Sequence, residues 1–482
     1  MSKIVVIGGS GYVGGRLVGR LLKDGHSVRC LVRDPRKLLG RDWPGVEIFK
    51  GNILDRESIA TAMAGYDIVY YLVHSISAGA EQYAELDRKG ASIVREVAAL
   101  SGVKRIIYLG ILGNRNSTLP PYHRSRNEVG EILASGSVPV TEFRAAMIVG
   151  SGSASFDMMH ALVNMLPIIV APRLVNTISQ PISTRDTIRY LAGCLDVPES
   201  IGKVIDIGGP DILSYNEMML RLAKQLNLKR RIFVVPGLVP PWFSSFWINL
   251  VTPIPTSLAR MLLDGLQCEM VIENDLASKL FSLKLMGFDE SVARALSRVR
   301  ELKVETKWSN ASFAPEPDQD VENNYSALLK DVRQLKVNAL PEQVYKVFIS
   351  IGGERGWYFG HILWRIRGFV DKIIGGVGLR RGRRHPLDLI PGDALDFWRV
   401  ETVEVGRRVV LRAEMKAPGI AWLEFCASPI GRSKTLFTQT ATFYPHGLAG
   451  FAYWYALSPF HVILFAKMAR EIARHAENES LT

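Results

Sequence analysis

The sequence predicts an α/β protein in which a doubly wound parallel sheet is followed by a smaller α+β domain. The 482-residue chain opens on an apolar strand that runs into a glycine-rich turn and then into a helical pattern. Short apolar segments alternate with helix-length stretches as far as about residue 300, and this alternation is typical of a parallel sheet covered on both faces. Beyond residue 325, strand patterns follow one another more directly, which indicates an antiparallel sheet.

The first turn of the predicted parallel sheet has the composition of a phosphate site. The segment KIVVIGGSGYVGG carries Gly8, Gly11 and Gly14 at GxxGxxG spacing. One glycine lets the chain turn, a second lets the backbone approach a pyrophosphate, and a third lets the helix lie close to the strand with its N–H groups facing the anion. Because strand, turn and helix are all present, we predict a dinucleotide site here, with Tyr12 and Val13 among its contacts.

The end of the second strand indicates which dinucleotide is bound. The strand SVRCLVR ends on Arg33, and Lys37 follows in a basic cluster. A carboxylate at this place would bind a ribose 2′-hydroxyl, whereas a guanidinium can hold a 2′-phosphate by charge-assisted hydrogen bonds. The cluster therefore favours NADP(H), while Asp34 keeps NAD(H) open as the less favoured alternative.

Further cofactor contacts are expected where later strands end at the same edge of the sheet, because ligands of doubly wound sheets bind there. Asn52 and Ile53 follow the third strand, and Asn52 is expected to meet the adenine. Val73 and His74 follow the fourth strand, on the ribose and nicotinamide side. For His74 a structural role at the strand end is an equal alternative. Gly110 lies at the end of the fifth strand.

These motifs resemble the atypical short-chain dehydrogenase/reductases, in the branch that includes NmrA-like regulators and the NADPH-binding accessory subunit of respiratory complex I. The resemblance rests on the glycine turn, on LVRDP around Arg33, and on the segments GNILD, EFRAAMIVG, QPISTRDTIRYL and IGGPDILSYNEM. It implies a Rossmann fold with a bound NAD(P)(H). With VHS at 73–75, HRSRNEVGEIL at 123–133 and the long C-terminal extension, the chain is similar to bacterial proteins that fuse such a domain to a START-like (polyketide cyclase-like) domain of unknown function.

The catalytic groups of that family are only partly present. Its catalytic members use a Ser after the fifth strand and a YxxxK pair on the next helix, where the Lys lowers the pKa of the Tyr and the Tyr exchanges a proton with the substrate. In this chain Gly110 or Ile111 stands at the Ser position, and Tyr122 and Arg126 have the YxxxK spacing. We expect Arg126 to face the cofactor and Tyr122 to be the candidate proton donor. The alternative is that Tyr122 precedes the helix, because two prolines stand before it.

Length and composition predict a cytoplasmic protein of two domains joined by a linker. The chain is 48% hydrophobic and 22% charged, which is a globular composition. The N-terminal apolar run is the first strand, so no signal peptide is expected. Four widely spaced cysteines indicate reduced thiols and no metal site. The expected boundaries are 1–300 for the NAD(P)-binding domain, 301–325 for a linker rich in Pro and acid, and 326–482 for the START-like domain.

The C-terminal domain is expected to open on a strand, a turn at 338–341 and an amphipathic helix. Four strand patterns and a closing helix with one apolar face follow. The START-like resemblance implies a helix-grip fold, in which the sheet wraps around the final helix and encloses a cavity for a small apolar ligand such as a lipid, quinone or polyketide. The expected lining is aromatic, with a filled core as the equal alternative: Phe397, Trp398, Trp422, Phe437 and Trp454.

Two segments allow peripheral association with a membrane. Residues 232–259 carry no charge and include several aromatics, but their prolines argue against a spanning helix. A buried junction with the C-terminal domain is the favoured interpretation of this segment, and a place at the bilayer interface is the alternative. Residues 355–384 hold eight basic side chains and one acid, in a chain of formal net charge +12, and such a patch attracts an anionic surface. No nucleic-acid-binding motif is present in the sequence, so nucleic acid is not an expected partner.

Two classes of function remain open from the sequence. The first, slightly favoured, is an NADPH-dependent oxidoreductase that acts on an apolar carbonyl-type, lipid-like or quinone-like molecule. The second is a non-catalytic NADP(H)-binding redox sensor or assembly factor, which the incomplete Ser/Tyr/Lys set favours.

Overall fold

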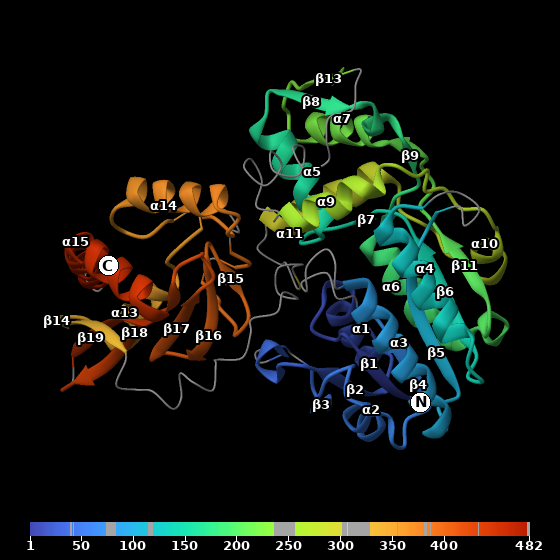
Figure 1. The fold of residues 1–482 in the computed structure, drawn as a ribbon, viewed down its shortest axis with the longest axis horizontal. Helices are drawn as coiled ribbons and strands as arrows, with labels where there is room; N and C mark the ends of the chain where they lie inside the picture. Colours follow the sequence, from blue (N-terminus) through green and yellow to red (C-terminus); the bar gives the residue numbers. More distant parts are fainter. Residues whose placement is uncertain are drawn as a thin grey trace. The chain divides into compact units, whose positions relative to one another are not determined.

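The computed structural model describes residues 1–38, 41, 43–73, 83–113, 119–235, 256–300, 306, 328–353, 355–379, 383–385, 387–431 and 433–479. Two compact units make up the chain, unit 1 at residues 1–311 and unit 2 at residues 312–482 (Figure 1). Of the linker expected at 301–325, Thr306 is the described residue. Each unit has its own hydrophobic core.

Unit 1 is built on a seven-stranded sheet in the order β11-β6-β5-β4-β1-β2-β3, and its strand pairs are parallel. This is the strand order of the doubly wound dinucleotide-binding fold, whose ligand site lies where the order reverses, beside β1 and β4. The predicted fold class is therefore confirmed. The strands are β1 (Lys3–Ile7), β2 (Ser27–Val32), β3 (Glu47–Lys50), β4 (Ile68–Tyr71), β5 (Arg105–Ile111), β6 (Val140–Ala145) and β11 (Val204–Ile207).

Helices cover both faces of this sheet, because successive residues of a strand point to opposite sides. Ile4 and Val6 of β1 join one core cluster, whereas Val5 and Ile7 join the other. On the first face lie α1 (Tyr12–Lys23), α6 (Thr184–Gly193) and α10 (Leu276–Leu280). On the second lie α2 (Arg56–Met63), α3 (Tyr83–Leu100) and α4 (Pro121–Ala134).

A second part of unit 1 follows β6 and is made of short strand pairs and helices. The pairs are β7 (Ile148–Val149) with β10 (Ile182–Ser183), β8 (Ile168–Pro172) with β13 (Arg231–Val235), and β9 (Ile178–Ser179) with β12 (Leu213–Ser214). A separate core cluster joins them to α5 (Ala154–Met165), α7 (Tyr215–Gln225) and α11 (Phe288–Arg300). The uncharged stretch at 232–259 ends in α9 (Thr256–Gly265), and its residues 236–255 lie outside the described part.

Unit 2 contains a six-stranded antiparallel sheet in the order β14-β19-β18-β17-β16-β15. Its strands are β14 (Leu329–Val337), β15 (Ala394–Leu395), β16 (Trp398–Glu404), β17 (Arg408–Ala413), β18 (Gly419–Ile430) and β19 (Lys434–Pro445). Its helices are α13 (Pro341–Ile349), α14 (His361–Ile373) and α15 (Gly447–Glu479). The opening strand and helix, the strands β16 to β19 and the closing helix agree with the sequence prediction, whereas α14 and the separate short strand β15 were not predicted. The expectation of a START-like ligand stays a prediction.

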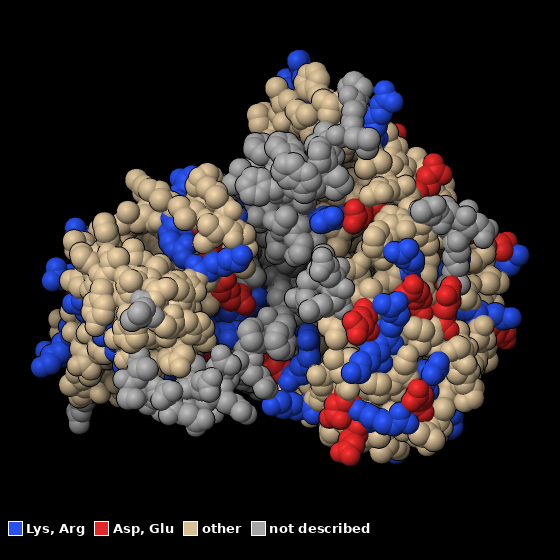
Figure 2. Space-filling view, in the orientation of Figure 1, with Lys and Arg blue, Asp and Glu red and all other residues tan. Residues whose placement is uncertain are grey.

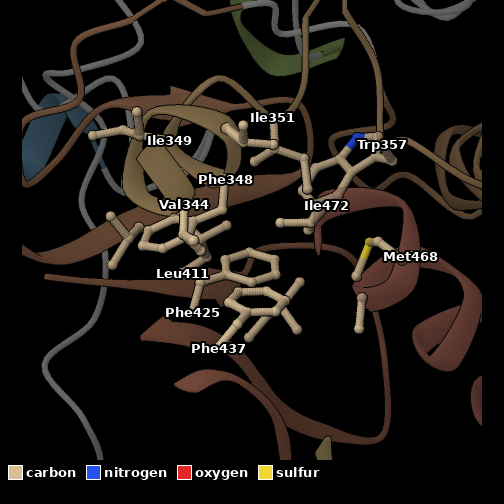
Figure 3. Packing of buried hydrophobic residues seen from close by; sticks show 14 of the residues in the cluster. Val344, Phe348, Ile349, Ile351, Trp357, Leu411, Phe425, Phe437, Met468 and Ile472 are labelled. Atoms are coloured by element: carbon tan, nitrogen blue, oxygen red, sulfur yellow. The ribbon is translucent and has the colours of Figure 1, made fainter. Parts of the chain in front are cut away.

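The core of unit 2 is aromatic and closely packed (Figure 3). Phe348 of α13 stacks on Phe425 of β18 with ring centroids 5.7 Å apart, and Phe425 stacks on Phe437 of β19 at 6.2 Å. Phe397 stacks on Trp357 at 6.0 Å. Of the five aromatics expected to line a cavity, three are buried in this packing, whereas Trp422 and Trp454 are half-buried.

One described helix, α15, is long and apolar enough to cross a membrane by length and composition. The stretch is Ala449–Asn478, with a mean hydropathy of 1.2 and 17% of the best window buried. The two halves of α15 differ in their surroundings. Phe465, Met468 and Ile472 in the second half are buried in the core, and the helix contacts β14, β19 and α13. That half is a core helix.

A buried ion pair joins β6 to β11 at one edge of the unit 1 sheet. Arg144 Nε donates to Asp206 Oδ1 at 2.7 Å, and the two residues are direct partners in the strand register. The backbone N–H of Glu273 donates to the other carboxylate oxygen at 2.9 Å. Since the Asp206 side chain is fully buried, its charge depends on Arg144 for compensation.

Replacing Arg144 by Leu should lower the free energy of unfolding of unit 1 by about 3–5 kcal/mol, because a buried carboxylate is left without its partner. Urea unfolding, with hydrogen exchange read at β6 and β11, measures this loss. The control Arg173→Leu changes an exposed guanidinium and should stay within about 0.5 kcal/mol of the parent protein. Equal unfolding midpoints for the two variants would contradict the role given to this pair.

Candidate dinucleotide and substrate site

The turn after β1 leaves room for glycine alone. Gly8 has a φ of +97°, and a Cβ on Gly14 would lie 2.2 Å from the Gly8 carbonyl oxygen. The Gly11 N–H donates to the same oxygen at 2.9 Å. Gly11 is the N-cap of α1 and forms no side-chain cap there. No side chain caps the first N–H groups of α1, and the turn beside them has no room for a Cβ. Both features fit a bound pyrophosphate.

Tyr12 links this turn to the start of α6. Its hydroxyl lies 2.8 Å from Thr184 Oγ1, and Thr184 also donates to the Val149 carbonyl at 3.1 Å. A Cβ on Gly150 would lie 2.2 Å from Thr184 Oγ1, so the loop after β7 approaches closely. A role for Thr184 was not predicted from the sequence. The signal that could have placed it is the motif ISTRD, in which Ser183 caps α6 just before it.

The basic residues predicted to select the cofactor lie beyond the end of β2. Arg33 directly follows Val32 and is exposed. Lys37 is half-buried in the short helical turn Pro35–Leu38, where its N–H donates to the Asp34 carbonyl at 3.2 Å. Both therefore stand at the carboxyl edge of the sheet, next to the strand that carries the glycine turn.

The candidates after β3 and β4 lie at the same edge. Asn52 Oδ1 accepts the N–H of Leu54 at 3.1 Å, so this side chain stabilises the turn into α2. Ile53 packs on α3, where a Cβ at Gly90 would lie 2.8 Å from its Cδ1. Val73 is half-buried and its methyl group adjoins Gly8. His74 lies outside the described residues.

Arg126 ties α4 to the ends of two sheet strands. Its guanidinium donates to the Val73 carbonyl at 3.1 Å and to the Leu109 carbonyl at 2.8 Å. The guanidinium carbon also lies 4.9 Å from the centre of the Tyr108 ring. Arg126 is buried and lies at the carboxyl edge where β4 and β5 end, so it has the position from which a cofactor ribose could be met.

Tyr122 is the second residue of α4, so it does not precede the helix. It lies one turn before Arg126, and residues four apart on a helix share a face. Burial raises the pKa of Tyr122, while the nearby Arg126 charge opposes part of that rise. Its ring centre lies 6.5 Å from that of Tyr83 on α3. At neutral pH Tyr122 therefore keeps its proton, as a proton donor must.

Gly110 faces a buried carboxylate in place of the serine of catalytic relatives. A Cβ at this position would lie 2.8 Å from Glu142 Oε1 and 3.2 Å from the Tyr108 ring. Glu142, on the neighbouring strand β6, is 3% exposed. The space that a serine side chain at position 110 would need is thus already filled. The packing of β5 on β6 therefore excludes a serine there.

His123 is buried next to Tyr122 on α4. Among the described residues neither of its ring nitrogens has a hydrogen-bond partner. Burial lowers the pKa of His123 from 6.5 to about 4. Gly265 of α9 lies against it, since a Cβ there would be 3.4 Å from His123 Cε1. The imidazole is therefore neutral at physiological pH. His123 was not predicted from the sequence as a site residue.

Two family models match separate parts of the chain. Residues 8–140 match a family described as NAD(P)H-binding, and residues 325–468 match a family described as a protein of unknown function. The first match covers the glycine turn and the whole of α4.

Curated relatives match parts of the chain. The photosystem II assembly factor Ycf39 of Trieres chinensis is 26% identical over 207 residues, which are 43% of this chain and 63% of that protein. An isoflavone reductase homolog of Zea mays is 26% identical over 49% of this chain and 78% of its own length. An uncharacterized sugar epimerase of Bacillus subtilis is 29% identical over 34% of this chain and 82% of its own. The chain thus spans less than two thirds of the Trieres protein.

Solved structures show the same fold at low sequence identity. The Citrobacter triphenylmethane reductase complexed with NADP(H) has a TM-score of 0.51 at 20% identity and covers 61% of this chain and 99% of its own. The Escherichia coli NADPH-dependent quinone oxidoreductase complexed with NADPH has a TM-score of 0.50 at 19% identity, with the same coverages. Unit 1 is an NAD(P)H-binding domain of the atypical short-chain dehydrogenase/reductase type, followed by a domain of unknown function.

Replacing Gly14 by Ala should weaken the binding of NADPH and of NADH to a similar degree, at least tenfold or about 1.4 kcal/mol. The reason is that the new methyl group pushes α1 away from the turn that would hold the pyrophosphate of either cofactor. Isothermal titration calorimetry on the full chain measures both affinities. Gly193→Ala is the matched control, since a Cβ there meets nothing within 4 Å. Unchanged affinities in a folded Gly14→Ala protein would remove the pyrophosphate from this turn.

The buried neutral state of His123 should appear in the pH dependence of stability. Its pKa is lower in the folded protein than in the unfolded chain, so the stability it contributes is fully present above about pH 6.5 and is lost as the pH falls toward 4. The total loss is about 3 kcal/mol. Urea unfolding across this range should show a flatter dependence for His123→Leu than for the parent, whereas His446→Leu, at an exposed position, should match the parent. Parallel curves for all three proteins would contradict the prediction.

Proposed function

We propose that the protein is an NADPH-dependent oxidoreductase that reduces an apolar carbonyl-type, lipid-like or quinone-like substrate, with Tyr122 as the proton donor. The observation that carries the proposal is the pair of Tyr122 and Arg126 on one face of α4, at the carboxyl edge of the sheet. NADPH, when bound, supplies the hydride that reaches the substrate carbon. The Tyr122 hydroxyl protonates the substrate oxygen and recovers its proton from solvent, which balances the reduction of one C=O to CH–OH.

The protonation state of Tyr122 favours reduction over oxidation. Burial keeps Tyr122 protonated, so it can donate a proton at neutral pH, whereas oxidation of an alcohol needs a base. Arg126 is held by two backbone carbonyls, and its charge lies where it would stabilise a phenolate formed as the proton leaves.

The proposed cofactor is NADP(H). Arg33 and Lys37 stand next to the strand that carries the glycine turn, and a guanidinium pairs well with a 2′-phosphate. The solved structures of Citrobacter and Escherichia coli reductases with this fold hold NADP(H) and NADPH respectively.

The surroundings of α4 support an apolar substrate. Helix α9 packs against α4, and an apolar cluster joins it to α5 through Ala154, Met158, Leu162, Leu262 and Leu263. Pockets lined mainly by such side chains, with a few polar groups that orient the ligand, are typical of sites for apolar small molecules.

The second candidate function is a non-catalytic NADP(H)-binding protein that acts as a redox sensor or assembly factor. Glu142 fills the place that a serine at Gly110 would need, so the proton relay lacks one of its usual groups. Curated relatives of Trieres and Synechocystis are named photosystem II assembly factors. This candidate predicts tight cofactor binding without turnover.

Replacing Arg33 by Asp should weaken NADPH binding by about 1.5–3 kcal/mol, the usual contribution of a hydrogen bond to a charged group. The affinity for NADH should stay nearly unchanged. Titration of the full chain with each cofactor measures the difference. Arg173→Asp, at an exposed position elsewhere in unit 1, is the control and should alter neither affinity. If Arg33→Asp weakened both cofactors equally, Arg33 would not contact a 2′-phosphate.

Replacing Tyr122 by Phe should lower the rate of NADPH oxidation by a quinone or aromatic aldehyde by about 10²-fold or more, while NADPH affinity stays the same. Single-turnover stopped-flow with menadione as the probe measures the rate. Tyr83→Phe, on the ring beside Tyr122, is the matched control and should keep most of the activity. A fully active Tyr122→Phe variant would exclude Tyr122 as the donor, and bound NADPH that no acceptor oxidises would favour the second candidate function.

A further inference from the structure

Helix α14 of unit 2 carries its apolar side chains outward. Ile362, Ile366, Phe369 and Ile373 are each at least half exposed and follow one another at helical spacing. Amphipathic helices of globular domains normally turn that stripe to the core. We call this row, with Leu363, Val370 and Ile374 beside it, the α14 stripe.

Polar contacts on the inner side of α14 hold the helix in this orientation. Asp371 is 1% exposed and accepts the N–H groups of Gly378 at 2.9 Å and of Lys416 at 2.7 Å. Gly368 approaches Leu379 so closely that a Cβ would lie 2.6 Å from the Leu379 side chain. Rotating the stripe inward would break these contacts, so its exposure is fixed by the fold of unit 2.

The first half of α15 continues the apolar surface. Residues 447–466 contain no charged side chain, and Phe451, Tyr455, Phe460 and Ile463 are between 37% and 63% exposed. A Cβ on Gly360, the N-cap of α14, would lie 2.3 Å from Leu464 of α15. The two helices thus meet within unit 2.

Within the segments that form this surface, the exposed charged side chains are Lys and Arg. Residues 355–370 and 447–470 contain no Asp or Glu, and Arg365, Lys416, Lys467 and Arg470 are exposed. In Figure 2 the surface of unit 2 over α14 is largely tan with blue side chains along its border. Apolar side chains flanked by Lys and Arg, with aromatics among them, are the composition of helices that lie in the headgroup region of a bilayer.

We propose that unit 2 docks on an anionic membrane surface through the α14 stripe and the first half of α15, without crossing the bilayer. Each large apolar side chain that leaves water contributes about 1.5–3 kcal/mol, and each Lys or Arg near an anionic surface contributes about 1 kcal/mol. The second half of α15 stays in the core of unit 2, so the helix lies along the surface. Docking would bring an apolar substrate within reach of the protein, but the surface itself does not depend on the function proposed above.

Flotation of the full chain with vesicles tests the proposal. We expect the chain to float with vesicles of phosphatidylcholine and phosphatidylglycerol, and less with phosphatidylcholine alone. The double variant Ile366→Glu/Phe369→Glu should lose at least tenfold in bound fraction. The matched control Ile168→Glu/Ile212→Glu changes two apolar side chains of similar exposure in unit 1, outside residues 232–259, and should float like the parent.

Two results would overturn the proposal. If the chain does not float but is a dimer in light scattering, and Ile366→Glu/Phe369→Glu makes it a monomer, the surface is an interface between copies. If the chain is a monomer that does not float, and the same variant lowers its thermal unfolding midpoint by several degrees, the stripe packs against another part of the chain. Circular dichroism of each variant confirms folding before these comparisons.

An independent observation in unit 1 carries a second inference. A cleft of about 510 Å³ is lined by α1, α6, α11 and the loop after β7. Its arginines are Arg16, Arg20, Arg185, Arg189, Arg294 and Arg298.

Some of these arginines already have partners: Arg20 pairs with Asp24 at 2.7 Å, and Arg16 donates to the Ser151 carbonyl and to the Thr306 hydroxyl, each at 2.8 Å. Asp186 lies 3.3 Å from Arg189, but it is fully buried and already accepts the Ser183 hydroxyl and the Met286 N–H. Arg294 is exposed and forms no ion pair with a described residue. Ser151 lines the cleft and is 1% exposed, and its hydroxyl has no hydrogen-bond partner in the described chain.

We infer that this cleft binds a small phosphate-bearing anion at a place separate from the dinucleotide. Several guanidinium groups around one opening suit phosphate oxygens, and the Ser151 hydroxyl supplies a further donor. Arg16 stands about one turn along α1 from Tyr12, whose hydroxyl bonds to Thr184, a residue that lines the cleft.

Calorimetric titration of inorganic tripolyphosphate into the full chain saturated with NADPH tests this inference. Arg294→Gln and Ser151→Ala should each weaken binding at least threefold, and together at least tenfold, whereas Arg173→Gln should not. A parallel titration uses short-chain phosphatidic acid. Tighter binding of phosphatidic acid than of tripolyphosphate indicates a lipid headgroup, and the reverse order indicates a free phosphate. Binding that disappears when NADPH is present, or that none of these variants changes, would overturn the inference.

Discussion

The contact between α1 and the turn after β1 is the constraint on which the rest of unit 1 depends. A Cβ on Gly14 would come within 2.2 Å of the Gly8 carbonyl, so the helix can approach only because glycine stands there. That approach places the uncapped N-terminus of α1 at the edge where the strand order reverses. Tyr12 bonds to Thr184 at the start of α6, and Thr184 donates to the Val149 carbonyl of β7 in the second part of the unit.

The chemistry open to the site follows from what surrounds α4. Arg126 takes the place of a lysine but donates to two backbone carbonyls, so it acts as a fixed charge at the sheet edge. Glu142 excludes a serine side chain from Gly110. A hydride acceptor that needs a single proton, delivered by Tyr122, is compatible with these groups. A reaction that needs a base at neutral pH is not supported, because burial keeps the Tyr122 proton in place.

The sequence predicted the features that depend on local pattern. The glycine turn, the doubly wound parallel sheet and the strands of unit 2 follow from alternation and spacing. Contacts between distant residues left no such pattern. The Tyr12–Thr184 bond joins positions 172 residues apart, and the carboxylate that fills the space beside Gly110 comes from the neighbouring strand. The exposure of the α14 stripe could not be predicted, because apolar periodicity predicts an amphipathic helix but not which face turns outward.

The central claim is that hydride leaves NADPH for an apolar molecule at the Tyr122 face of α4. Incubating the full chain with NADPH deuterated at the transferred position and an apolar cell extract, followed by mass spectrometry, tests it directly. The account predicts an apolar product that carries deuterium, with NADP⁺ formed in equal amount, and no such product from the Tyr122→Phe protein. Labelled NADPH that stays bound and unoxidised while the extract remains unlabelled would contradict it.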